Sequence, residues 1–157
     1  MNDEQSKRIA EAAEAIVQAT EALEDAREVL QDRRFESDVE RERQAASGLL
    51  ASRVDSAARR IEDAVRKSAV AAAAAARPGA YERYKEAIAA AGKGRSLGKT
   101  ITDQDGSPAK RARAEEAIGQ LSLALDIAAG LVFTKDESLP QERPDEAPAE
   151  VAVAEDS

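Results

Sequence analysis

The chain offers few side chains for chemistry, and the most suggestive group is a basic, glycine-rich segment in its second half. Glycine-rich backbone and the start of a helix both favour bound phosphate. No aromatic platform or base-reading pattern accompanies these cations, so nucleic-acid binding here would be salt-sensitive and blind to sequence. A solvated loop that keeps the protein soluble, or that touches the acidic C-terminal segment, explains the same residues. The candidate anion contacts are Lys93, Arg95, Lys99, Lys110, Arg111 and Arg113.

Two shorter motifs in this segment fall short of known binding loops. Gly98-Lys99-Thr100 matches the end of a phosphate-binding loop, but the glycine that should precede it by five residues is missing. Asp103 to Gly106 resembles part of a calcium loop, but Ile101 and Ala112 occupy positions that require oxygen ligands. We therefore expect a flexible polar loop over residues 92–106 that binds neither a nucleotide nor calcium.

Composition argues against an enzyme. The chain has no cysteine and no histidine, which removes thiol nucleophiles, disulfides, the usual zinc sites and the commonest general base. Carboxylates are plentiful, but their spacing places them on the outer faces of helices, where no acid–base pair is expected. We expect no catalytic residue, no cofactor and no metal.

The strongest structural signal is a sevenfold apolar repeat near the N-terminus. Ile9, Ile16, Leu23 and Leu30 recur every seven residues, and small alanines follow each of the first three by three residues. This pattern predicts a helix over residues 3–33 with one apolar seam. A second seam, marked by Leu50, Val54 and Ile61, predicts another helix over residues 38–76. With a turn at residues 34–38, the two helices form a long antiparallel, coiled-coil-like hairpin, and both seams are candidate oligomerisation surfaces.

Turn-forming residues predict where the remaining helices begin and end. Arg77-Pro78-Gly79 must stop the second helix, because proline lacks an amide donor and restricts the residue before it. We expect a short third helix over residues 80–91 that ends at Gly92 as a left-handed cap. Ser107-Pro108 should open a fourth helix that runs to Ala129, with Gly130 as its cap. This last helix is the most apolar, and we expect it to be the most buried, with Leu123 and Ile127 widening its core-facing stripe.

The fold class is therefore all-α, with a helical bundle domain over residues 1–133. Residues 134–157 are rich in Pro, Glu and Ala and carry eight acids and two bases. This acidic tail is expected to be disordered alone or docked on a partner.

Three functional hypotheses remain open. Alanine makes up 36 of 157 residues, and its small side chain buries little area, so association with another chain is the usual remedy. The leading hypothesis is a non-enzymatic structural or assembly protein (scaffold, connector, virion component or chaperone) that works by homo-oligomerisation and by binding a larger protein assembly. The alternatives are a nucleic-acid accessory protein that uses the basic residues 93–113, and an amphipathic coating protein on a lipid or polymer surface.

The expected cellular location rests on two features that the sequence does not show, a secretory signal and a long apolar run. Residues 2–4 are polar and acidic where a secretory signal needs a basic start. The longest apolar run, residues 69–76, is far shorter than the ~20 residues of a membrane span. We expect a cytoplasmic protein, or one held within an assembled particle, without a transmembrane segment.

Overall fold

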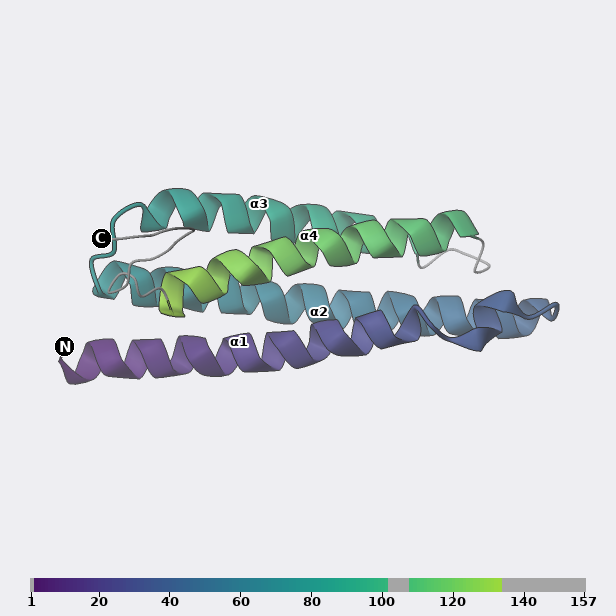
Figure 1. Ribbon diagram of the computed structural model, residues 1–157, viewed down its shortest axis with the longest axis horizontal. Helices are drawn as coiled ribbons and strands as arrows, with labels where there is room; N and C mark the ends of the chain where they lie inside the picture. Colours follow the sequence, from purple (N-terminus) through teal and green to yellow (C-terminus); the bar gives the residue numbers. More distant parts are fainter. Residues whose placement is uncertain (1, 102–107, 134–157) are drawn as a thin grey trace, which may run out of the picture.

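The computed structural model describes residues 2–101 and 108–133, and nearly all of them are helical (Figure 1). No strand occurs in these two ranges, so the all-α fold class is confirmed. The elements are α1 (Asp3–Val29), the short 3-10 helix η1 (Arg33–Glu36), α2 (Glu40–Ala74), α3 (Ala80–Lys99) and α4 (Pro108–Phe133). The acidic tail expected at 134–157 lies outside the described residues.

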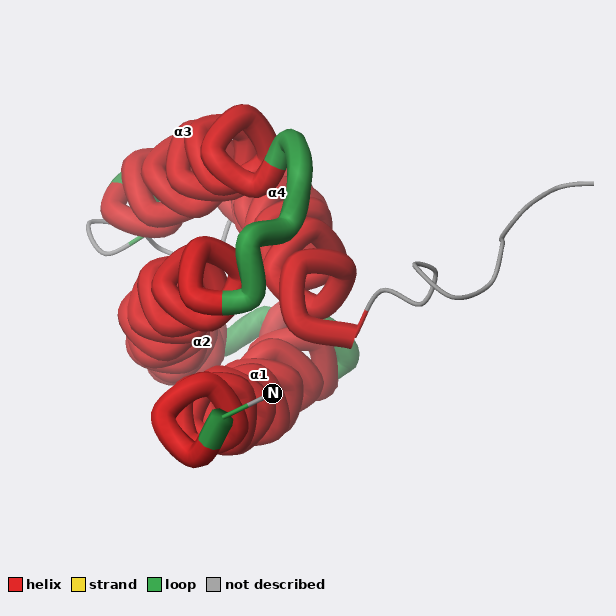
Figure 2. Tube along the Cα trace, turned by 90° about the vertical axis from the view of Figure 1, so that its left-hand side faces the viewer, coloured by secondary structure: helices red, strands yellow, loops and turns green. Residues whose placement is uncertain are grey.

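The four long helices form an up-and-down bundle in which each helix runs antiparallel to the next (Figure 1). Seen end-on, α2 and α4 lie between α1 and α3 (Figure 2). Among the described residues, α2 packs on all three other helices, whereas α1 and α3 do not contact each other. Helix α4 packs mainly on α3 and α2 and less on α1, so one side of it faces outward.

The predicted hairpin is present, with shorter helices than the sequence indicated. Asn2 caps α1 through a capping box with Gln5, in which each side chain accepts from the other residue's backbone N–H. Helix α1 ends at Val29, four residues before the predicted end, and η1 makes the turn into α2. Val39 precedes α2 without a side-chain cap, while the Ser37 hydroxyl accepts from its amide at 3.0 Å. This turn buries the Phe35 ring.

Asp32 at the start of η1 gives the fold an acid-sensitive contact. The Arg34 side chain donates to both Asp32 carboxylate oxygens, and with the Arg34 amide it lowers the pKa of Asp32 below its usual 3.8. This stabilisation is present above the unfolded-state pKa and is lost as pH falls through the lower folded-state value. Between neutral pH and pH ~3, we expect the free energy of unfolding to fall less for Asp32→Asn than for the unchanged chain. Acid titration followed by circular dichroism measures this, and equal losses in both proteins would contradict the assignment.

Both predicted seams lie inside the bundle of a single chain. Ile16, Leu23, Leu50, Val54 and Ile61 are all buried. Ile9 and Leu30 are partly buried and pack against the same core. These side chains are covered by other helices of the same chain, so a contact with a second molecule has to be sought on the outer surface.

The third helix is longer than predicted, and this is the main correction to the fold. It continues through Gly92 and Gly94 to Lys99, so Gly92 is not a cap and residues 92–99 are not a loop. The left-handed glycine in this region is Gly79, with φ of 75°, which precedes α3 after the expected Arg77-Pro78 stop. Residues 102–106 of the predicted loop lie outside the described residues.

Glycine serves packing rather than termination in α3. A Cβ at Gly94 would lie 2.7 Å from Leu121 Cγ of α4, and one at Gly98 would lie 2.7 Å from Val54 Cγ1 of α2. These two glycines let α3 approach both neighbouring helices closely. Helix α4 likewise runs four residues beyond its predicted end, through Gly130 to Phe133.

Candidate interaction surface

The outer side of α4 carries an apolar stripe that no other helix of the chain covers. Residues on this side recur at alternating spacings of four and three, which keeps them on one face of a helix. Leu123 at its centre is 45% exposed and Phe133 at its end is 50% exposed. Residues 117–133 contain a single charged side chain, Asp126. We call this face the α4 outer stripe; it comprises Ala112, Glu116, Gly119, Leu123, Asp126, Gly130 and Phe133.

The exposure of Leu123 corrects one half of the expectation that Leu123 and Ile127 widen the core-facing side of the fourth helix. The residues predicted to face the core do so: Ala114, Ile118, Leu121, Leu125, Ala128 and Val132 are all buried. Leu123 instead points outward, whereas Ile127 is partly buried and packs against the core as predicted. Because α4 is apolar on nearly every side, its sequence shows no polar face that would mark the outside.

Charged pairs line the outer face of α2, although single large apolar residues are also exposed on the other helices, namely Val17 on α1, Val70 on α2 and Tyr81 on α3. On α2, Arg59 pairs with Asp55 at 2.9 Å and Lys67 pairs with Asp63 at 3.4 Å. Such exposed pairs add little stability but keep a surface hydrated. A large apolar area within a charged surface is a common mark of an interaction site.

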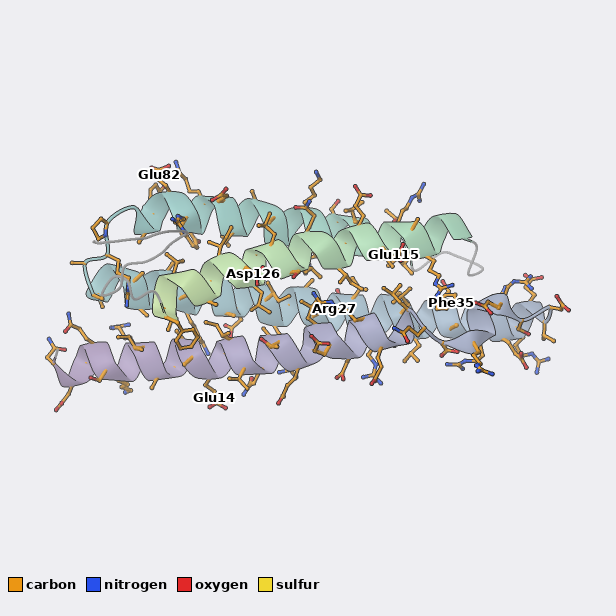
Figure 3. The ribbon with its side chains drawn as sticks, viewed as in Figure 1. Glu14, Arg27, Phe35, Glu82, Glu115 and Asp126 are labelled. Carbon is orange, nitrogen blue, oxygen red and sulfur yellow. The ribbon has the colours of Figure 1, made fainter. Side chains whose placement is uncertain are left out.

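Polar contacts from α1 and η1 hold α4 in the orientation that exposes the stripe. The Arg27 guanidinium of α1 donates to the Ser122 hydroxyl of α4 at 3.1 Å, and Arg27 lies between the two helices in Figure 3. Arg111, near the start of α4, donates to the Leu30 carbonyl. Its guanidinium carbon also lies 5.3 Å from the centre of the Phe35 ring, a cation–π distance. These contacts fix the rotation of α4 about its axis.

The predicted anion contacts come together at one end of the bundle, because α3 ends and α4 begins there (Figure 1). Arg95 is held by Glu62 of α2, with 3.2 Å between nitrogen and oxygen, and Arg111 by Leu30 and Phe35. Lys93, Lys99 and Arg113 are exposed. The Lys110 side chain lies outside the described part. Two of the six cations therefore hold the bundle together, a role that sequence spacing cannot reveal because their partners are distant in the chain.

A shallow groove between α2 and α3 lies beside these cations. It has a volume of about 390 Å³, and Val54, Gly98, Arg95 and Lys99 are among its lining residues. Gly98 and Lys99 form the last turn of α3 rather than a loop, so they cannot wrap a phosphate as a phosphate-binding loop does. Within the described ranges, no cluster of three acidic side chains is placed to hold a metal ion.

Comparison of the chain with protein-family models, with curated proteins and with solved structures finds no match. The interpretation of the site therefore rests on the geometry of this chain alone.

One finding bears on the prediction that the chain has no membrane span. Residues 111–133 of α4 are long and apolar enough to cross a bilayer by length and composition, and 44% of their most apolar window is buried in the bundle. The core helix of a soluble protein passes the same test.

Proposed function

We propose that this protein is a non-enzymatic helical assembly protein, which works by associating with itself and with a larger partner through the α4 outer stripe. The observation that carries the proposal is the exposure of Leu123 and Phe133 on a stretch of α4, residues 117–133, that contains a single charged side chain. Burial of such a surface in a contact is favourable at about 25 cal/mol per Å². A preformed, rigid helix face also loses little conformational entropy on binding.

Leu123→Glu tests this proposal. Leu123 is 45% exposed and faces away from the core, so the variant should fold normally. The new carboxylate would have to be desolvated in the contact, close to Glu116 and Asp126, and we expect association to weaken by tenfold or more, about 1.4 kcal/mol at least. Light scattering at matched concentrations measures the mass of both proteins.

Val70→Glu provides the matched control, because Val70 is 46% exposed and lies on α2. It makes the same kind of change at an equally exposed position away from α4, so the mass should stay that of the unchanged chain. An unchanged mass for Leu123→Glu, in a protein that does associate, would show that the contact uses another face.

A second candidate, a protein that coats a lipid surface, is favoured by the bilayer-compatible length and composition of α4. The charges around the stripe oppose it. Among residues 111–133 the exposed charges are Arg113, Glu115, Glu116 and Asp126, so acids outnumber bases; Figure 3 labels Glu115 and Asp126. Membrane-surface helices use basic residues to attract anionic lipids, so this face suits a protein contact better than an anionic bilayer.

A further inference from the structure

We propose that the α4 outer stripe binds a second copy of the same stripe in antiparallel orientation, with the two-fold axis passing close to Leu123. The inference rests on the proposed function and specifies its partner and geometry. In a two-fold contact the same patch appears on both subunits, so that residue i meets residue j and residue j meets residue i. The stripe must therefore be complementary to its own reversed copy.

The distribution of large and small residues about Leu123 meets this requirement. Glu116 lies seven residues before Leu123, and Gly130 lies seven residues after it. Gly119 lies four residues before, and Asp126 and Ile127 lie three and four residues after. Residues equally far from the axis on opposite sides come to the same height in an antiparallel pair. Glu116 thus meets Gly130 of the other copy, Ile127 meets Gly119, Asp126 meets Gln120, and Leu123 meets itself.

The residues at the two ends of the stripe also come close to one another in this antiparallel pair. Phe133 lies ten residues after Leu123, and Ala112 lies eleven residues before it. The Phe133 ring therefore comes to the height of the exposed Arg113, which lies ten residues before Leu123, with the small Ala112 beside it. Alternation of large and small side chains across a helix pair allows close packing of the backbones.

Two alternative registers place like charges together. A parallel in-register pair would set Glu116 on Glu116 and Asp126 on Asp126, leave Gly119 opposite Gly119, and align the two helix dipoles unfavourably. An antiparallel pair shifted by one turn would bring Asp126 opposite Glu116 of the other copy. The register centred on Leu123 keeps both carboxylates of the stripe opposite an uncharged residue, Gly130 for Glu116 and Gln120 for Asp126.

The small buried area of the contact limits the affinity of the dimer. One helix face provides less than the ~800 Å² per partner of a standard interface. We therefore expect a weak, concentration-dependent dimer with a dissociation constant in the micromolar range.

Engineered cysteines test the geometry directly, because the chain has none of its own. Gly119→Cys and Ile127→Cys are prepared separately, and Leu123 is retained in both. Under mild oxidation the mixture of the two variants should form a disulfide-linked dimer. Each variant alone should not, because in the proposed pair two copies of residue 119 are ~12 Å apart along the helix axis, too far for a disulfide.

Gly119→Leu distinguishes a closely packed protein contact from non-specific hydrophobic association. A Cβ at Gly119 meets no atom within 4 Å in the monomer, so leucine should raise the melting temperature of the dilute chain by about 3 °C through helix propensity. The same leucine overfills the proposed contact, and we expect dimerisation to weaken roughly tenfold. Gly92→Leu, at an exposed helical glycine of α3 that is equally open, should stabilise the chain without changing dimerisation.

The outcomes are distinct. Cross-linking in the mixture alone, together with a weaker Gly119→Leu dimer, supports the antiparallel pair. Cross-linking of each variant alone would overturn it in favour of a parallel pair and would leave the proposed function standing. A dimer that never cross-links would place the contact elsewhere, which keeps self-association but removes its assignment to the α4 outer stripe. A Gly119→Leu variant that binds phosphatidylcholine vesicles more tightly while remaining monomeric would make a lipid surface the occupant. A monomer at every concentration would remove self-association from the proposed function as well.

Discussion

Leu23→Asp is expected to remove a large part of the protein's stability and to lower its melting temperature steeply. Leu23 is 2% exposed in the core, and an aspartate there would place an unpaired charge among apolar side chains. Removal of the packing and burial of the charge together remove about 3–5 kcal/mol or more, a large part of the 5–15 kcal/mol typical of a domain. Circular dichroism with thermal denaturation measures the loss of helix.

Val17→Asp is the control for this substitution, since Val17 lies on the same helix but is 55% exposed. It should change stability by no more than about 0.5 kcal/mol. A Leu23→Asp protein with the melting temperature of the Val17→Asp protein would contradict the intrachain core.

Gly94→Ala and Gly92→Ala should change stability in opposite directions, although the two residues are two positions apart in α3. Alanine at the exposed Gly92 gains helix propensity and meets no atom within 4 Å, so we expect a gain of up to about 1 kcal/mol. Alanine at Gly94 would press on Leu121 and on the Ala117 carbonyl, whose oxygen lies 3.0 Å from the new Cβ. We expect a loss of about 1–3 kcal/mol.

Urea denaturation of the two variants provides the comparison. A gain in both would mean that α3 and α4 do not approach as closely as the structure places them. A loss in both would mean that Gly92 also has a packing or terminating role, as its sequence context first suggested.

The hairpin and the core could be predicted from the sequence because α1 and α2 are amphipathic. Ile16, Leu23, Leu50 and Ile61 recur on one face of each helix, and charged residues fill the other. The stop after α2 could be predicted because a Pro-Gly pair excludes continued helix. These are local signals, and the structure preserves them with small changes in boundaries.

The errors have two physical causes. Gly92 and Gly130 carry the signal of a helix cap, yet glycine also occurs inside helices where another backbone approaches, and sequence alone does not separate the two uses. Helix α4 is apolar on almost every side, so its outward face could not be distinguished from its core face until its neighbours were placed. The partners of Arg95 and Arg111 could not be predicted from the sequence either, because Glu62 and Leu30 are distant from them in the chain.

The α4 outer stripe therefore emerges only from the assembled bundle. Three helices cover most of α4 and leave Leu123 between Gly119 and Gly130 on the outside. The same arrangement covers the two seams that the sequence marked as oligomerisation surfaces. Self-association, if carried by the remaining apolar face, leaves the core of each chain intact.

Sedimentation equilibrium of the unchanged protein over a wide concentration range tests this account most directly. We expect the apparent mass to rise from the 16.7 kDa of one chain toward twice that value across the micromolar range, with helicity unchanged throughout. A mass that stays at one chain at every concentration would contradict self-association through α4. A rise in mass accompanied by a change in helicity would instead show that the bundle opens to associate.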